Sequence, residues 1–176
     1  MSGGSRTKRA ITGFRQDAGG DWVAELACLH SQHMRHNPPL NFRPRVTDAG
    51  ARQARIGTEI GCPLCDRAEL PAELTLLRTA GPFTDESLPA GLRRTHHTAE
   101  GVWGVLRVLD GVVRCHLEVC PPLDVVLAAG SGQPLPPGIA HRIDLDPAAR
   151  LAVEFWGRPR GAGQPGGRGA RPEAAS

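Results

Sequence analysis

The feature that most constrains the fold is a series of short apolar segments between residues 102 and 156, separated by turns rich in glycine and proline. The segments alternate apolar and polar residues or are continuously apolar, which is typical of strands, and no comparable helical pattern appears among them. They are VWGVLRVLDG, VVRCHLEV, LDVVLAAGS, GIAHRIDLD and RLAVEFW. Strands at this spacing predict an all-β sandwich or barrel in this half of the chain.

The first part of the chain has a different pattern. The segment ITGFRQDAGGDWVAELAC predicts a β-hairpin with its turn at residues 17–20. TDAGARQARIG then predicts a short helix, with Thr47 or Asp48 as its N-cap and Gly57 at its C-terminal end. TEIGCPLCDR predicts a short strand that runs into a Cys-x-x-Cys turn, and AELPAEL is the predicted linker. The expected domains are residues 10–67 and 73–157, between disordered tails at 1–9 and 158–176.

The net charge of +3 comes from the two tails, and the remainder of the chain is slightly acidic. An acidic body argues against nucleic acid as a partner, because phosphate contacts need basic side chains. No apolar run reaches the ~20 residues of a membrane span. The N-terminus lacks the apolar stretch of a signal peptide, so we expect a cytoplasmic protein with reduced thiols. Five cysteines, two of them in a Cys-x-x-Cys pair, then indicate metal binding before disulfides.

Two close pairs of ligand-type residues predict a structural zinc site. Cys28 and His30 form the first pair, and Cys62 and Cys65 form the second. A Cys3His set is an accepted zinc coordination. A module of about 60 residues has a small hydrophobic core and commonly needs a metal ion or another cross-link for stability. The alternative is that Cys28 is a small buried apolar residue and that the histidines are solvated.

The same stretch holds two further histidines, His33 and His36. On an extended strand their spacing places them on opposite faces, so they are not expected to share one ion with His30. Together with Arg35 they are candidates for binding a small anion, and their role stays open.

The segments DWVAELACLHSQHMRHNPP and GTEIGCPLCD resemble a small bacterial domain family of unknown function, over about residues 10–67. That family repeats a pattern of the form WVA-L-C-x-H-x-Q-H-x-R-H-x-PP, followed by CxxCD. Leu29 stands where the family pattern predicts a glycine, which implies mild strain in the Cys-x-His turn. The resemblance implies no activity.

A second constellation resembles the cupin barrels, whose metal ligands come from two separated motifs. PPGIAH, ending at His141, matches the second motif, in which Pro136 and Gly138 shape the turn that delivers the histidine. Aligning Gly111 with the hairpin glycine of the first motif places His97 at the first histidine position. His97 and His141 are therefore the expected inward pair.

The first cupin motif is incomplete in this chain. Ala99 occupies the place of its second histidine, and a one-residue shift of the alignment would substitute His96 for His97. Glu100 and Glu154 compete for a carboxylate position, with Glu100 preferred. The expected ligand set is His97, His141 and Glu100, with zinc, iron, manganese or nickel as the metal. A metal-free barrel is the alternative.

The segments HHTAEGVWGVLRVLDGVVR, PGIAHRI and VEFW resemble the cupin domain of tellurite-resistance proteins of the TehB/YeaR type, over about residues 73–157. The fold class is therefore expected to be mainly β: a zinc-ribbon-like α+β module followed by a cupin barrel of the double-stranded β-helix or jelly-roll type. No methyltransferase fingerprint is present. The resemblance to cupins also suggests a homodimer.

The function that these residues favour is a bacterial two-module metal-binding protein whose cupin pocket captures a small anion or metabolite. The resemblance links it to tellurite or other oxyanion stress. A metal-dependent cupin enzyme of the oxygenase or isomerase type is one alternative, because open coordination positions also suit catalysis. A zinc-knuckle adaptor is another. The sequence leaves open whether the chain is an enzyme.

Overall fold

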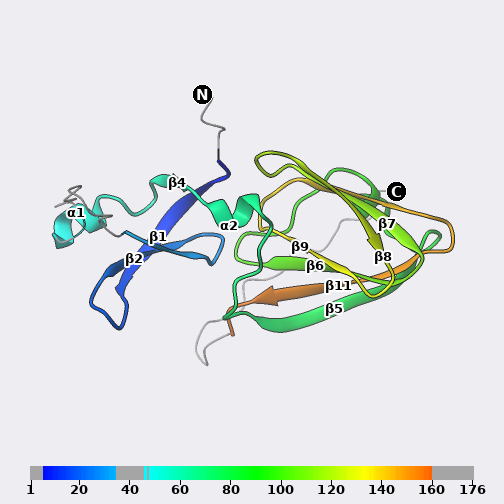
Figure 1. Cartoon of the computed structure of the whole chain (residues 1–176), viewed down its shortest axis with the longest axis horizontal. Helices are drawn as coiled ribbons and strands as arrows, with labels where there is room; N and C mark the ends of the chain where they lie inside the picture. Colours follow the sequence, from blue (N-terminus) through cyan, green and yellow to red (C-terminus); the bar gives the residue numbers. More distant parts are fainter. Residues whose placement is uncertain (1–5, 35–45, 47, 160–176) are drawn as a thin grey trace, which may run out of the picture.

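The computed structural model describes residues 6–34, 46 and 48–159. These residues form an N-terminal module and a larger C-terminal β-domain that lies beside it (Figure 1). The fold is mainly β, as the sequence predicts. The predicted C-terminal tail lies outside the described residues from position 160 onwards. The predicted N-terminal tail is shorter than residues 1–9, because the first strand begins at Lys8.

The N-terminal module is built on a four-stranded antiparallel sheet in the order β3-β2-β1-β4. Its strands are β1 (Lys8–Gln16), β2 (Trp22–Leu26), β3 (Ser31–His33) and β4 (Glu59–Gly61). The predicted hairpin between β1 and β2 is confirmed. Its turn is held by the carboxylate of Asp17, which accepts hydrogen bonds from the backbone N–H groups of Gly19 and Asp21.

Two short helices complete the module. The predicted helix is α1 (Ala49–Gln53), and its N-cap Asp48 accepts a hydrogen bond from the backbone N–H of Ala51. Thr47, the other predicted N-cap, lies outside the described residues. The predicted Cys-x-x-Cys turn is the single helical turn α2 (Pro63–Asp66), which begins directly after Cys62. Proline suits this first helical position because its φ angle is already helical.

The C-terminal β-domain consists of two antiparallel sheets, in the orders β5-β11-β6-β9 and β10-β7-β8. All five segments predicted as strands are strands. The elements are β5 (Thr75–Thr84), α3 (Ala90–Arg93), β6 (Trp103–Asp110), β7 (Val112–Leu117), β8 (Leu123–Ala128), β9 (Gly132–Leu135), β10 (His141–Leu145) and β11 (Arg150–Gly157). The sequence pattern does not predict β5, β9 or the single turn of α3.

Residues from both sheets share one hydrophobic core. Strands β6, β9 and β11 contribute one side of it, and β7, β8 and β10 contribute the other. The side chains that are fully buried there include Leu106, Leu117, Leu135, Ile143 and Leu151. The two sheets therefore lie face to face and are held by apolar burial between them.

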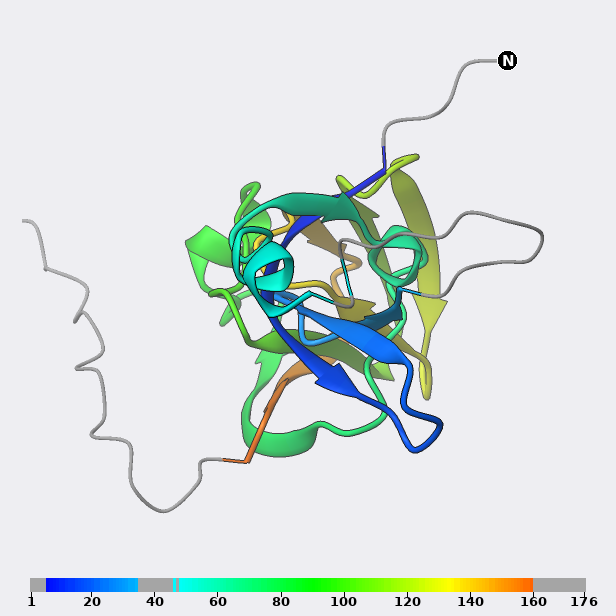
Figure 2. The ribbon, with the colours of Figure 1, turned by 90° about the vertical axis from the view of Figure 1, so that its left-hand side faces the viewer.

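A second core joins the two parts of the chain. Trp103 of β6 is fully buried, and it packs with Ile11, Leu26 and the three cysteines of the N-terminal module. Its neighbour across the strand pair, Trp156 of β11, lies at the edge of the same cluster. Figure 2, which views the molecule from the N-terminal side, shows β1 and β2 in front of the C-terminal β-domain. The modules thus share part of their interior.

Within the described residues, the structure contains no helix that is long and apolar enough to cross a membrane.

Candidate metal centre and ligand cavity

The structure brings together the four predicted zinc ligands. Cys28 and His30 belong to the tight connection between β2 and β3. Cys62 directly precedes α2, and Cys65 lies within that helical turn. All four side chains are buried, and their ligand atoms lie within 4.8 Å of one another. Among the described residues this is the one cluster of three or more metal-ligand side chains.

The distances within the cluster match the edges of a zinc tetrahedron. Zinc–sulfur and zinc–nitrogen bonds of ordinary length place two sulfurs about 3.8 Å apart, and a sulfur and a nitrogen about 3.6 Å apart. The two sulfurs of Cys28 and Cys62 are 3.9 Å apart. The Nδ1 atom of His30 lies 3.5, 3.4 and 3.7 Å from the sulfurs of Cys28, Cys62 and Cys65. The four atoms therefore surround a point that fits one ion.

The ring of His30 is held so that Nδ1 faces the sulfurs. Its Nε2 lies 2.8 Å from the backbone carbonyl oxygen of Glu69, which fixes the donating N–H on that side. A histidine that ligates a metal commonly donates its other N–H to a carbonyl in this way. The Trp103 ring packs nearly perpendicular to the same imidazole, with the ring centroids 5.2 Å apart.

Without an ion at the centre, the pKa values of the cluster residues keep it from being fully deprotonated. Hydrogen bonds from Cys28 and Cys65 hold the pKa of Cys62 far below its usual value, whereas the neighbouring sulfurs of Cys28 and Cys62 push the pKa of Cys65 far above its own. Burial would lower the pKa of His30, but the sulfurs of Cys28 and Cys62 outweigh it and raise that pKa to about 9. Three buried thiolates can coexist only when a positive charge lies between them.

Arg9 of β1 supplies a further positive charge close to the cluster. Its guanidinium group favours the thiolate of Cys65, and its Nε and Nη2 atoms are buried without a hydrogen-bond partner in the described structure. Zinc with three thiolates and one neutral imidazole carries a net charge of −1. Arg9 is therefore placed to balance the charge of a loaded cluster.

The Cys-x-His turn carries the strain that the sequence predicts. Leu29 has a positive φ of 69°, a conformation that costs a non-glycine residue roughly 1–2 kcal/mol. The turn is closed by a hydrogen bond from the Leu29 N–H to the Leu26 carbonyl oxygen, 2.8 Å long. The same turn holds the Cys28 carbonyl oxygen where the indole N–H of Trp103 donates to it, at 2.8 Å. The C-terminal β-domain thus fastens the backbone that carries two of the cluster residues.

The other histidines of this stretch do not join the cluster. His33 is exposed at the end of β3, and its Nδ1 lies 3.4 Å from a carboxylate oxygen of Asp17. An acidic neighbour makes His33 a poor partner for a small anion. Arg35 and His36, the other candidates for that role, lie outside the described residues.

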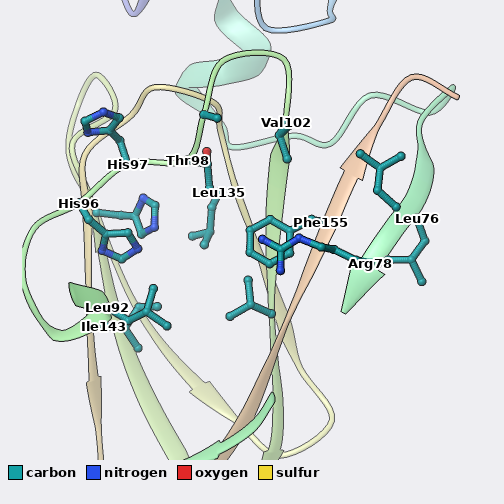
Figure 3. Close-up of a pocket in the computed structure, with 14 residues that line it drawn as sticks. Leu76, Arg78, Leu92, His96, His97, Thr98, Val102, Leu135, Ile143 and Phe155 are labelled. Carbon is teal, nitrogen blue, oxygen red and sulfur yellow. The ribbon is translucent and has the colours of Figure 1, made fainter. Parts of the chain in front are cut away.

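The C-terminal β-domain contains a cavity of about 750 Å³. Its walls are mostly apolar and include Leu76, Leu92, Val102, Leu135, Ile143 and Phe155. Its polar groups are Arg78, His96, His97, Thr98 and His141. Figure 3 shows His96 and His97 on one side of the cavity and Arg78 with Phe155 on the other. No carboxylate is found among the described residues that line it.

The histidine that contacts His141 in this cavity is His96. The two residues form an isolated antiparallel bridge, and their ring centroids are 4.2 Å apart. Gly138, with a φ of 64°, and Pro136 shape the turn that precedes His141. The alignment through Gly111 predicts His97 at this position, whereas the structure pairs His96 with His141 through the isolated bridge. His97 lines the cavity but is exposed.

In both His96 and His141, the Nδ1 atom lies within hydrogen-bond distance of a backbone carbonyl oxygen. His141 Nδ1 lies 3.0 Å from the oxygen of Ile139, and His96 Nδ1 lies 3.0 Å from that of Arg94. Carbonyl oxygens only accept, so Nδ1 carries the proton and Nε2 offers a lone pair in both rings. The Nε2 of His141 is buried and has no hydrogen-bond partner in the described structure. A buried acceptor of this kind is expected to meet a ligand or a water.

Neither predicted carboxylate lines the cavity. Glu100 is exposed in the loop before β6. Glu154 lies on the opposite face of β11 from Phe155, where it accepts hydrogen bonds from Arg107 and Trp156 at 3.1 and 3.0 Å. These outward partners explain a charge within the apolar segment LAVEFW. The set of His97, His141 and Glu100 is therefore not brought together as three ligand atoms of one site.

Arg78 is a cavity residue that the sequence reasoning missed. Its guanidinium carbon lies 3.7 Å from the centroid of the Phe155 ring, in cation–π contact. The available signal was the alternation of Leu76 and Arg78 in TLLRTAGP, which places both on one face of a strand. The exposed residues and the Gly81-Pro82 pair of β5 obscured that strand. The structure thus adds a permanent positive charge to the cavity.

We expect protonation of His141 to destabilise the folded protein. Burial lowers the pKa of His141 to about 4, the nearby His96 and His97 add to this, and the hydrogen bond to Ile139 offsets part of it. The unfolded chain then binds more protons between its ordinary pKa near 6.5 and pH 4. Stability from this group is full above about pH 6.5 and is lost as the pH falls towards 4, on the order of 3 kcal/mol.

An NMR titration of the His141 ring checks this directly. A His141→Leu variant should also lose most of the decline in unfolding free energy between pH 6.5 and 4. A midpoint for His141 near that of a free histidine would contradict the expectation.

The remaining cysteines have structural surroundings. Cys115 of β7 is buried in the C-terminal core, and burial raises the pKa of its thiol to about 12. Cys120 is partly exposed beyond the end of β7. Both are free thiols.

Comparison with known families divides the chain in the same two parts. Residues 12–69 match the model of a family described as a protein of unknown function (DUF3565), and residues 78–153 match that of the TehB-like domain. No curated protein matches this chain in sequence.

Two solved structures are similar to part of the chain. One is a protein from E. coli (strain K12), with 20% identity and a TM-score of 0.48, covering 52% of this chain and 98% of its own. The other is TehB from Haemophilus influenzae, with 22% identity and a TM-score of 0.45 over 51% of this chain. The match spans 33% of that TehB. At this level neither likeness carries an argument about function.

Proposed function

We propose that this chain is a two-module protein in which zinc holds the N-terminal module and the C-terminal β-domain captures a small anionic ligand. The modules would span about residues 10–67 and 73–157. The observation that carries the ligand-binding part is the buried Nε2 of His141, which has no partner in the described structure and lines a cavity of about 750 Å³. Cavities of this size and largely apolar lining are typical of small-molecule sites.

The zinc assignment is supported by the fit of the residues to the ion. Three sulfurs and one imidazole nitrogen form a buried set with tetrahedral spacing, and the second nitrogen of His30 is engaged by Glu69. A closed set of four protein ligands leaves no open position, so the ion would be structural and not catalytic. Zinc would supply the charge that lets the three sulfurs ionise together.

The anionic character of the ligand is supported by the charges around the cavity. Arg78 brings one permanent positive charge, whereas His141 is neutral at physiological pH and no described lining residue is acidic. We further propose that this domain is a cupin-type barrel, and that it serves oxyanion stress such as tellurite resistance, on the strength of the TehB-like match. A cytoplasmic location and a homodimer stay predictions.

A metal-dependent cupin is the second candidate, and one observation favours it. Both His96 and His141 place Nδ1 against a carbonyl oxygen and leave Nε2 available, as metal-ligating histidines do. The absence of a carboxylate from the described lining and the presence of Arg78 weigh against it, because a divalent cation there would lack charge compensation. His97 at the cavity edge could contribute a third nitrogen only after moving inwards.

Metal analysis of the purified protein separates the two candidates. We expect about one zinc per chain, lost in Cys62→Ala and unchanged in His141→Leu, because only the first variant removes a ligand of the Cys3His cluster. A second metal that disappears in His141→Leu would establish the metal-dependent alternative. A wild-type protein without zinc after metal-replete expression would contradict the zinc assignment.

A further inference from the structure

The size of the cavity bears on the kind of anion that it can hold. An inorganic oxyanion of four or five atoms occupies roughly the space of a few water molecules, on the order of 100 Å³. The cavity measures about 750 Å³, within the range of about 300–1,000 Å³ that is usual for organic ligands. A bare oxyanion would leave most of this volume to water.

The walls of the cavity also suit an organic molecule. Leucine, isoleucine and valine side chains from β5, α3, β9, β10 and β11 line it together with Phe155. Leu76 and Leu77 of β5 are 49% and 42% exposed, so apolar surface on this side is open to solvent in the described structure. A strongly hydrated inorganic ion gains nothing from such walls, whereas an apolar chain or ring is stabilised by their burial.

The polar groups of the cavity are divided between two sides. Arg78 lies with Phe155 on one side, and its guanidinium group only donates hydrogen bonds. His96 lies on the other side (Figure 3). Its ring contacts that of His141, with the ring centroids 4.2 Å apart. Because its Nδ1 proton faces the Ile139 carbonyl, His141 presents only an acceptor at Nε2. The two sides therefore suit different groups of a ligand: an anionic group can bind at Arg78, and an O–H or N–H donor can bind at His141.

We propose that the cavity binds an amphiphilic organic anion, with a carboxylate or similar head at Arg78, an apolar body along the leucines, and a hydroxyl or amide donor at Nε2 of His141. This inference rests on the proposed ligand-binding function and names the class of ligand. It also separates the two roles within the site. Arg78 selects for charge, whereas His141 selects for a donor at the far end of the molecule.

Calorimetric titration of the zinc-loaded full chain tests this inference with a matched set of probes. The probes are octanoate, its ω-hydroxy form, octanol, and the inorganic ions tellurite and phosphate. We expect ω-hydroxyoctanoate to bind most tightly and octanoate less tightly, with octanol and both inorganic ions weakest. If the eight-carbon chain is too short or too long to reach both sides, the hexanoate and decanoate pairs should show the same order.

Variants assign the two ends of the ligand. Arg78→Met should weaken both carboxylates about tenfold to a hundredfold, because a charge-assisted hydrogen bond is lost, and should leave octanol unchanged. His141→Leu should remove the preference for the hydroxyl form. Arg114→Met is the control, because Arg114 pairs with Asp146 outside the cavity. Circular dichroism establishes that each variant is folded, and Arg78→Lys offers a milder change at the same position.

The outcomes distinguish the inference from the function on which it rests. Binding of tellurite or phosphate that depends on Arg78 and His141, without binding of the organic probes, would overturn the inference and leave anion capture in place. Organic binding that Arg78→Met does not weaken would overturn the assigned ligand class. If no probe of either class binds the folded, zinc-loaded protein, the proposed function fails together with the inference.

Discussion

Replacing Cys62 with alanine is expected to abolish zinc binding and to unfold the N-terminal module. Binding of structural zinc supplies an apparent free energy of about 10–16 kcal/mol in small zinc modules, which is comparable to the whole stability of a domain. Cys62 is buried, and its sulfur contacts both Cys28 and His30 in the cluster. Its loss leaves three ligands and opens the coordination sphere to water. A strong chelator should act in the same way on the wild-type protein.

The structure changes what should happen to the rest of the molecule. The sequence alone predicts that the C-terminal β-domain stays intact when the zinc is removed. However, Trp103 of that domain is fully buried against the cysteine cluster and donates a hydrogen bond to the Cys28 carbonyl oxygen. Loss of the module would expose Trp103 and weaken the adjacent ends of β6 and β11. We therefore expect a folded but less stable C-terminal β-domain.

Hydrogen exchange and tryptophan fluorescence measure this result. Amide protection should disappear in β1, β2, β4 and α2, fall near Trp103 and persist in β7 and β10. Cys115→Ala is the matched control, because Cys115 is a buried cysteine of the C-terminal core outside the cluster and its loss should leave zinc content unchanged. A Cys62→Ala protein that keeps its zinc and its N-terminal protection would show that the ion is held elsewhere.

The cysteine cluster could be predicted from sequence because its ligands come as two close pairs. Cys28 with His30, and Cys62 with Cys65, each need only a local turn to direct two side chains to one point. The hairpin of β1 and β2 was equally predictable, since its turn residues mark it. The strain at Leu29 was also predictable, because the family pattern has glycine at this position. The structure shows the positive φ that glycine would adopt there without strain.

The cavity was harder to predict because its residues are brought together by long-range contacts. Arg78 lies on the edge strand β5, whose largely exposed residues give no apolar signal. His96 replaces His97 as the partner of His141 because one isolated bridge fixes the backbone there, and strand periodicity does not describe a single bridge. Glu154 faces outwards to Arg107, a pairing across two strands that sequence spacing does not show.

Trp103→Ala is expected to be the most destabilising substitution outside the metal ligands. Trp103 is the largest fully buried side chain of the described structure, and truncating a buried tryptophan costs about 3–5 kcal/mol. The Cys28 carbonyl oxygen also loses its donor, which adds roughly 1–3 kcal/mol if it stays buried. Because the removed indole also contacts His30, zinc affinity should fall although no ligand has been changed.

Two further variants separate the causes of that effect. Trp103→Phe keeps a buried aromatic ring but removes the five-membered ring with its N–H. It should therefore cost roughly 1–3 kcal/mol, less than Trp103→Ala, and should lower zinc affinity less. Trp156→Ala removes the partly exposed cross-strand neighbour and should cost less than Trp103→Ala. Denaturant unfolding of the zinc-loaded chain, followed by zinc release in the same titration, reports both quantities. If the two parts shared no core, Trp103→Ala would lower the stability of the C-terminal β-domain and leave zinc release where it is in the wild type. A shared core instead predicts that both transitions move together, because one side chain belongs to both.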